Sequence, residues 1–320
     1  MGRYNPDLKL SKQTVAICVK EFKAKVDMGP KEKRKVAELF IEADEDHIKV
    51  KGRKGVQARL IYVHEGVVEH PRRHLKNPRY FTTVGKGPED FWLEVCDYIA
   101  AHYDLLSIKA IYLSGDGANW IRAGREYLPG AIFVLDKFHL SKYILRATAH
   151  APGLKAPIYR AIHRLDKQAV LTKLDEALVL ADEPARKKRI RDTARYVKNN
   201  WDGIEAQVKH PHVSCSAEGH VSHVLSARLS SRPMAWSLKG ADNMARIRAI
   251  KANGEQVREH CIASFKTPPA IKLDQEVEKE LVRVKEKMLG KKDFNNLPLL
   301  KGKCSLTRIA LKGLQEKMIV

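Results

Sequence analysis

The sequence contains no long apolar segment. In 320 residues no uninterrupted apolar run exceeds five, whereas a transmembrane helix needs about 20. The first ten residues, MGRYNPDLKL, also lack the apolar stretch of a secretory signal peptide. These absences exclude a membrane span and favour a protein of the cytoplasm.

Cysteine is scarce and irregularly placed. The chain has five cysteines, an odd number, without a Cys-x-x-Cys pair or a regular spacing. Disulfide frameworks need an even set, and zinc ribbons need paired cysteines. We therefore expect reduced, mostly buried thiols rather than a disulfide framework or a zinc ribbon.

Positive charge, in contrast, is abundant. The chain has 59 lysines and arginines against 38 aspartates and glutamates, a net charge of +21. Such a field favours a polyanionic partner, with nucleic acid as the first candidate; a generally basic protein without that partner is the alternative. One run on a predicted helix fits a solvated face and a DNA-backbone contact equally well: Arg186, Lys187, Lys188 and Arg189.

The order of the predicted elements indicates the fold class. Strands and helices are distinguished by the spacing of their apolar residues. The pattern predicts strands at Glu38–Val50, Val56–His64 and Tyr80–Val84, a helix at Pro88–Tyr103, a strand at Ile108–Leu113, a helix at Ala118–Leu128, a strand at Ala131–Leu135 and a helix from Asp136. This order, β-β-β-α-β-α-β-α, predicts three antiparallel strands followed by parallel ones, the mixed sheet of the α/β ribonuclease H-like fold.

The rest of the chain is helical in composition. A capped helix over residues 10–22 is either a surface helix or part of a helix-turn-helix. We divide the chain into a helical N-terminal remnant, the first part of the ribonuclease H-like core, an all-helical insertion, the last core helix with the end of the core, and a basic helical C-terminal region, at residues 1–36, 37–136, 137–215, 216–250 and 251–320.

One strand carries acids at alternate positions. Asp44 lies in the middle of the first strand, where alternation places Glu42, Asp44 and Asp46 on one face. Like charges on a half-buried face repel, and burying them without compensation costs roughly several kcal/mol. A divalent cation is the simplest remedy; hydrated acids on a solvent-facing edge strand are the alternative.

Two further acids lie at the ends of elements. Asp116 follows the fourth strand between Gly115 and Gly117, at the carboxyl end where open α/β sheets bind ligands, although it could simply cap the next helix. A dinucleotide-binding fingerprint is excluded because Trp120 stands where its third glycine would be. Glu218 opens a later helix, where the ordinary role of an acid is to interact with the helix dipole.

Two aspartates and one glutamate form a suitable ligand set for two Mg²⁺ ions, which prefer oxygen ligands, and Mn²⁺ can substitute. Ions held in this way activate a water or a 3′-hydroxyl and stabilise the leaving oxygen of an in-line phosphoryl displacement. This chemistry needs no His or Cys ligand, but it needs a phosphodiester held in a positive groove.

Four motifs stand out in the chain: LFIEADEDH (39–47), SGDGANWI (114–121), FVLDKFH (133–139) and AEGHVSHVLSARLSSRPMAW (217–236). They resemble those of the DDE transposases of bacterial insertion sequences. The branch they resemble most is also catalogued as an uncharacterised protein family and is distantly similar to Mutator-type transposases. The resemblance covers roughly residues 36–250, and the last motif is long enough to be specific.

The resemblance implies a site and an activity. Asp44, Asp116 and Glu218 would be the catalytic triad and the ligands of two Mg²⁺ ions, with Asp46 as the alternative for the first position. The activity would be hydrolysis at insertion-sequence ends, followed by attack of the freed 3′-hydroxyl on target DNA. Because two ends must meet, self-association on DNA is expected, in the cytoplasm at the nucleoid.

Other features of the family leave alternatives open. Asp136 and His139 match the C/D-x-x-H motif of Mutator-type enzymes, and His139 either supports the site or contacts DNA, or is a satisfied helix-start histidine. Family members carry a longer N-terminal region, so a truncated, inactive DNA-binding remnant is one alternative to an active transposase. A ribonuclease H-like nuclease is another.

The segment around Glu218 is rich in cations and histidines. Arg228 and Arg232 are placed to hold a phosphate near the metal ions. Five potential zinc ligands also lie nearby, but their irregular spacing is not that of a zinc finger, so we expect them to line the approach to Glu218 or to contact phosphate: His210, His212, Cys215, His220 and His223.

Overall fold

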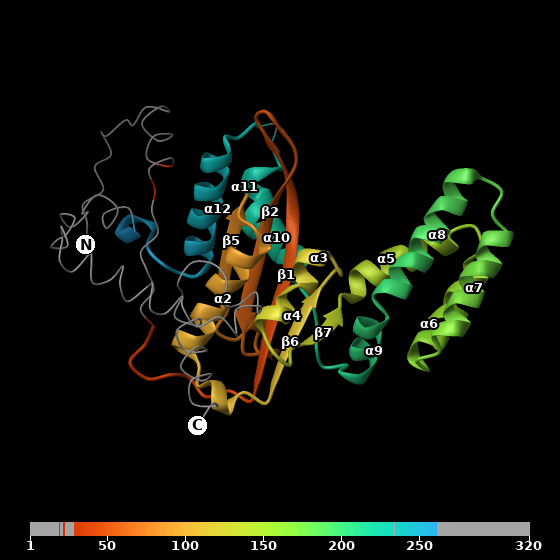
Figure 1. Cartoon of the computed structure of the whole chain (residues 1–320), viewed down its shortest axis with the longest axis horizontal. Helices are drawn as coiled ribbons and strands as arrows, with labels where there is room; N and C mark the ends of the chain where they lie inside the picture. The colour runs from red at the N-terminus through yellow and green to blue at the C-terminus, as the bar shows by residue number, and fades with distance from the viewer. Residues whose placement is uncertain (1–18, 20–21, 23–28, 233, 261–320) are drawn as a thin grey trace, which may run out of the picture.

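The computed structural model describes residues 19, 22, 29–232 and 234–260. Its centre is a five-stranded mixed sheet in the order β5-β2-β1-β6-β7 (Figure 1). β1 pairs antiparallel with β2 and parallel with β6, while β5 and β7 form the edges. The strands are β1 (Glu38–Val50), β2 (Arg53–His64), β5 (Arg79–Val84), β6 (Ala110–Gly115) and β7 (Ile132–Leu135). The predicted α/β class and mixed sheet are confirmed, with the first strand at the centre.

β1 and β2 form a long hairpin that is closed by a glycine turn. Gly52 has a φ of +71°, a left-handed conformation that favours glycine. The chain therefore reverses at once, and β2 begins at Arg53, earlier than predicted. The hydrophobic pattern does not predict the small sheet of β3 (Val67–Val68) and β4 (His74–Leu75), because strands of two residues are too short to show alternation.

One face of the sheet packs on α2, α3 and α4. Leu39, Ile41 and Ala43 alternate along β1 and are fully buried on this face. The helices are α2 (Pro88–His102), α3 (Asn119–Arg122) and α4 (Gly124–Tyr127), and a short 3₁₀ turn, η1 (Leu105–Ser107), leads into β6. Trp92 of α2 is the largest fully buried side chain of this core.

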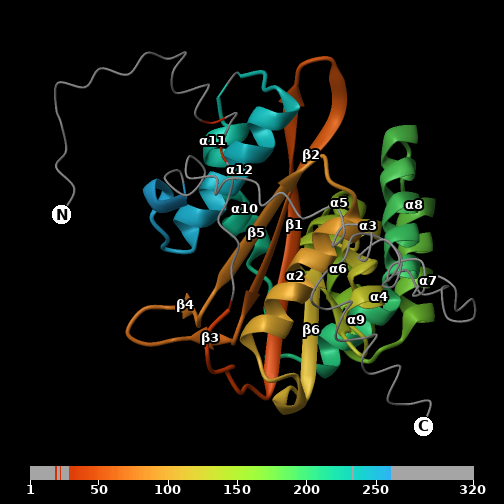
Figure 2. The same ribbon diagram turned by 60° about the vertical axis from the view of Figure 1, so that its left-hand side comes forward.

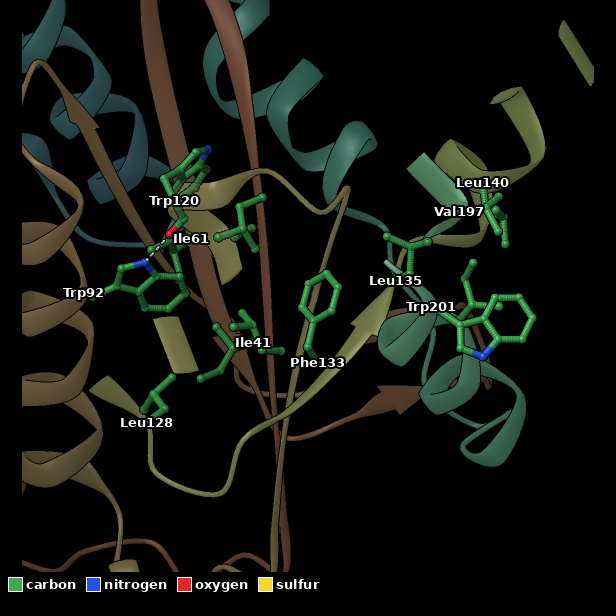
Figure 3. Close-up of a cluster of buried hydrophobic side chains, with 14 of the residues drawn as sticks. Ile41, Ile61, Trp92, Trp120, Leu128, Phe133, Leu135, Leu140, Val197 and Trp201 are labelled. Atoms are coloured by element: carbon green, nitrogen blue, oxygen red, sulfur yellow. Dashed lines mark hydrogen bonds between the residues drawn. The ribbon is translucent and has the colours of Figure 1, made fainter. Parts of the chain in front are cut away.

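The helix predicted over residues 118–128 is divided into α3 and α4. The indole N–H of Trp92 donates to the carbonyl oxygen of Trp120 at 2.8 Å, which Figure 3 shows as a dashed line. In an unbroken helix that oxygen would accept from the backbone N–H of Gly124. A Cβ at Gly124 would also lie 2.6 Å from the Trp92 ring, so close packing of the indole accompanies the break.

The other face of the sheet is covered by the segment after residue 216. The helix predicted to begin at Glu218 is present, but it contains a π turn, and its Val221, Val224 and Leu225 are buried. The elements are α10 (Ala217–Val221), the π turn η3 (Ser222–Ser226), α11 (Ala227–Leu229) and α12 (Leu238–Ala252). α12 packs on the edge strand β5.

The helices after β7 extend to one side of the sheet. Figure 1 shows α6, α7 and α8 away from β1 and β2, and Figure 2 shows α7 and α8 apart from these strands as well; α9 packs next to β7. In the close-up of Figure 3, Leu135 of β7 lies with Leu140, Val197 and Trp201 of these helices. The elements are α5 (Lys137–Thr148), η2 (Pro152–Leu154), α6 (Lys155–His163), α7 (Lys167–Val179), α8 (Pro184–Asn199) and α9 (Trp201–Lys209).

Several predictions concern segments that the structure does not describe. The helix over residues 10–22, apart from Val19 and Phe22, and residues 261–320 lie outside the described residues. In the described ranges, no helix has the length and apolar character needed to cross a membrane. The domain boundaries remain a prediction.

Candidate functional site

Adjacent parallel strands bring Asp44 and Asp116 together. The parallel register of β1 and β6 pairs Glu42 with Ser114. Asp44 follows Glu42 by two residues and is still within β1, and Asp116 follows Ser114 by two residues, just after the end of β6. Alternation puts these side chains on the same face as Glu42 and Ser114, and the two carboxylates are near enough for the charge of Asp116 to affect the pKa of Asp44.

The carboxyl of Asp44 is buried without full compensation of its charge. Its exposed fraction is 8%, and this burial raises its pKa to about 7. The backbone N–H of Glu45, which donates to Asp44 at 2.8 Å, and the charge of His139 oppose the shift, whereas the charge of Asp116 adds to it. A cation bound beside Asp44 and Asp116 would relieve this repulsion.

A third strand end contributes Asp136 and His139. Asp136 follows β7 and caps α5 by accepting from the backbone N–H of Phe138 at 3.0 Å. Its other oxygen lies 2.7 Å from Nδ1 of His139. This hydrogen bond is the main cause that raises the pKa of His139, with the charges of Asp44 and Asp116 adding to it. The Asp136–His139 motif therefore lies at the same site as the two aspartates.

Glu218 occupies a different position. It lies in the first turn of α10 with an exposed side chain. Within the described part of the chain, no three His, Cys, Asp or Glu side chains are grouped closely enough to hold a metal ion. The structure thus brings two of the three predicted acids together, and the participation of Glu218 remains a prediction.

A buried network around Glu42 connects α10 to β1. Glu42 is 1% exposed and accepts from the hydroxyl of Tyr62 and from the backbone N–H of Ser216, the N-cap of α10. Nε2 of His64 lies 3.0 Å from its other oxygen. Although burial raises the pKa of Glu42, these hydrogen bonds outweigh that effect and hold the pKa below its ordinary value. Glu218 follows Ser216 by two residues, so this network anchors the helix that carries it.

The sequence places Glu42 on the acidic face, but nothing in the local pattern indicates its role. Its partners come from β2 and from the loop before α10, up to 174 residues away. Asp46, the alternative first acid, instead accepts from the hydroxyl of Ser230 at 2.6 Å. Since the charge of Asp116 raises the pKa of Asp44, while Asp46 is hydrogen-bonded to Ser230, the geometry favours Asp44 over Asp46.

The predicted phosphate-binding cations lie in separate places. Arg228 is exposed, with its guanidinium 5.3 Å from the centre of the Trp236 ring. Arg232 lines a hollow of about 670 Å³ together with His47 and Lys49 of β1. On α8, Arg186 lies 3.5 Å from Glu183, while Arg189 lines a different hollow.

The five potential zinc ligands do not converge. His210 and His212 pack against the ring of Tyr112 at β6. Nδ1 of His220 lies instead 3.0 Å from the hydroxyl of Tyr80 on β5. The absence of a metal-binding group among the described residues therefore applies to these histidines as well.

Comparisons with known proteins give a family. The sequence profile of the uncharacterised protein family UPF0236 matches residues 1–264. UPF0236 protein TTE2489 of Caldanaerobacter subterraneus subsp. tengcongensis is 40% identical over 318 residues, which are 98% of this chain and 69% of that protein. UPF0236 protein TTE0402 of the same organism is 39% identical, over 98% of this chain and 64% of its own length.

A third relative from that organism is named for eleven loci, from TTE0033 to TTE2212. It is 40% identical, over 98% of this chain and 68% of its own length. The chain thus spans about two thirds of the length of these relatives. The mixed α/β protein described above belongs to the UPF0236 family.

Proposed function

We propose that the protein is a metal-dependent DNA transposase with a ribonuclease H-like core. The observation that carries this proposal is the pairing of Asp44 and Asp116 at the ends of adjacent parallel strands. An acid in the first strand beside an acid after the next parallel strand is the arrangement expected for that core. The net charge of +21 supports a nucleic-acid substrate.

Asp44 and Asp116 suit a divalent cation. Carboxylate oxygens are the ligands that Mg²⁺ prefers, and the raised pKa of Asp44 reflects a charge that such an ion compensates. In this proposal Glu218, on the helix that Glu42 anchors, is the third ligand of two Mg²⁺ ions, and Mn²⁺ can substitute. When bound, the ions supply activation of a water or a 3′-hydroxyl and stabilisation of the leaving oxygen.

The other residues of the site would place positive charge beside the aspartates and bind the phosphates of the DNA. Asp136 holds His139 by its Nδ1 and favours the protonated ring, which places positive charge beside the two aspartates. Arg232 lines a hollow with His47 and Lys49, which are on the same strand as Asp44. Arg232 would contact phosphates of the DNA, as would Arg228. Self-association on DNA at the nucleoid belongs to the same proposal, because two DNA ends must be joined to a target.

The relatives support the proposal that a mobile element encodes this protein. One of them carries eleven locus names in a single organism. Many copies of one protein in one genome are what the spread of an insertion sequence produces.

The test is cleavage of DNA that carries the sequences flanking the gene. The wild type should nick this DNA in Mg²⁺ or Mn²⁺ but not in EDTA. Asp116→Asn should reduce nicking by roughly 100-fold or more, because the amide can still accept the hydrogen bond from Ala118 but cannot supply an anionic ligand. Asp182→Asn, the same change at an exposed helix-flanking position, is the matched control and should retain activity.

Two results would contradict the proposal. Binding of the flanking DNA without cleavage by the wild type would indicate an inactive DNA-binding remnant. Cleavage that is independent of the flanking sequences would indicate a ribonuclease H-like nuclease instead.

A further inference from the structure

A hollow of about 890 Å³ lies between the helices after β7 and the loop that carries Asp116. Gly117 and Asn119 line it on the side of the sheet, and residues of α5 and α8 line it on the other side. Its long side chains are basic or aromatic: Arg122, Tyr143, Arg146, Arg189, Arg195 and Tyr196.

The lining is positively charged. It contains four arginines and a single acid, Asp192. Arg195 lies 3.6 Å from Asp192, and Arg122 lies 2.9 Å from Asp202, outside the lining. Arg146 and Arg189 are exposed and have no ion pair with any residue that the structure describes. An anion that enters the hollow therefore meets two guanidinium groups that are not neutralised.

An aromatic pair connects the hollow to the aspartates. The rings of Tyr143 and Tyr196 are stacked, with centroids 4.0 Å apart and planes at 12°. The hydroxyl of Tyr196 donates to the backbone oxygen of Asp116 at 2.6 Å. The hollow therefore begins at the loop that holds one of the two paired acids.

The size of the hollow suits one strand rather than a duplex. Pockets of about 300–1,000 Å³ hold molecules of drug size. A short segment of single-stranded DNA is of that size. Arginines bind its phosphates, and tyrosine rings offer faces on which bases stack. A glycine is favoured at position 117, which lines the hollow, because its φ is +92° and a Cβ there would lie 2.3 Å from the side-chain oxygen of Asn200.

We propose that this hollow binds a single DNA strand next to the phosphodiester that is cut, with Arg146 and Arg189 on its phosphates. The inference rests on the proposed function for the identity of the strand, and it extends that function by assigning a strand-binding role to α5 and α8. It adds Arg146 to the predicted Arg189 and separates both from Lys187 and Lys188, which do not line the hollow.

The test measures binding in EDTA, where no cleavage takes place. Fluorescence anisotropy compares a labelled single-stranded DNA oligonucleotide, the same sequence as a duplex, and the same sequence as RNA. The double variant Arg146→Ala/Arg189→Ala should bind the single-stranded DNA about tenfold more weakly, and the slope of log K against log salt should fall by about 1.4, which is 0.7 for each lost contact.

The control removes two arginines from the same group of helices. Arg160 and Arg164 are exposed at α6 and do not line the hollow, so Arg160→Ala/Arg164→Ala should leave the affinity for single-stranded DNA within about twofold and the slope nearly unchanged. Urea unfolding of both variants should match the wild type, since all four side chains are exposed.

Three outcomes would overturn the inference: equal losses in the two double variants, an equal loss for the duplex, or a preference for RNA over single-stranded DNA. Its failure is distinguishable from failure of the proposed function. A wild type that never nicks DNA, yet shows the selective loss at Arg146 and Arg189, would reject the transposase activity and retain the strand-binding site.

Discussion

At the scale of single residues, the site contains two buried carboxyls that differ in their hydrogen-bond partners. Glu42 and Asp44 are neighbours on one face of β1, and both are at least nine-tenths buried. Glu42 accepts hydrogen bonds from Tyr62, Ser216 and His64, whereas Asp44 accepts from the N–H of Glu45. Glu42 therefore stabilises the structure in its ionised form, while Asp44 is destabilising when ionised unless a cation is bound.

The metal-free protein should lose stability as the pH rises. The pKa of Asp44 is about 7 in the folded protein against an ordinary value of 3.8, so the folded state retains a proton that the unfolded state releases between these values. The free energy of unfolding should fall over this window because of Asp44. Asp44→Asn removes the effect and should exceed the wild type at pH 8 by up to about 4 kcal/mol.

Urea unfolding in EDTA at pH 5 and pH 8 measures this difference. The wild type and Asp44→Asn should differ less at pH 5, where the Asp44 carboxyl is protonated in the folded protein. An identical pH dependence in the two proteins would contradict the uncompensated charge.

Removal of Glu42 should be strongly destabilising. Glu42→Ala removes the carboxylate to which the hydroxyl of Tyr62 and the ring of His64, both buried, are hydrogen-bonded, and we expect a loss of about 3–5 kcal/mol in the free energy of unfolding at pH 7. Glu183→Ala removes an exposed acid that lies 3.5 Å from Arg186, and it should change the stability by less than about 0.5 kcal/mol. Similar values for the two variants would show that the network around Glu42 contributes little.

At the scale of elements, the positions of the helices follow from a few close contacts. α3 and α4 are separate helices at the point where the indole of Trp92 donates a hydrogen bond to the Trp120 carbonyl oxygen and packs against Gly124. α10 begins where the backbone of Ser216 meets Glu42. In both cases a side chain of one element provides the hydrogen bond that ends or begins another, as buried helix termini require.

A methyl group at Gly124 should disturb the packing of α2 on α4. Its Cβ would lie 2.6 Å from the Trp92 ring, and overpacking of a filled core costs about 1–3 kcal/mol. Gly153→Ala is the matched control, since nothing lies within 4 Å of a Cβ there, and it should be neutral or slightly stabilising. Thermal unfolding of both variants tests the difference, and a Gly124→Ala protein as stable as Gly153→Ala would refute the tight contact.

At the scale of the whole molecule, much of the fold could be predicted from the sequence. The apolar run at residues 39–41 and the acids at alternate positions after it indicate the strand Glu38–Val50, and Pro88 marks the start of α2. These signals are local, so they do not depend on distant contacts. The break between α3 and α4 and the small β3–β4 sheet could not be predicted, because a distant indole and strands of two residues leave no periodic pattern.

The candidate site, like the fold, could be predicted only in part from the sequence. The sequence by itself determined that acids alternate on the face of β1 and that Asp116 follows a strand, since alternation and glycine turns are properties of neighbouring residues. Only the tertiary structure decided that Asp44, rather than Asp46, lies beside Asp116, that Glu42 anchors α10, and that Arg146 and Arg189 line one hollow. Each of these depends on strand register or helix packing, which joins segments far apart in the chain, and no local pattern encodes those distances.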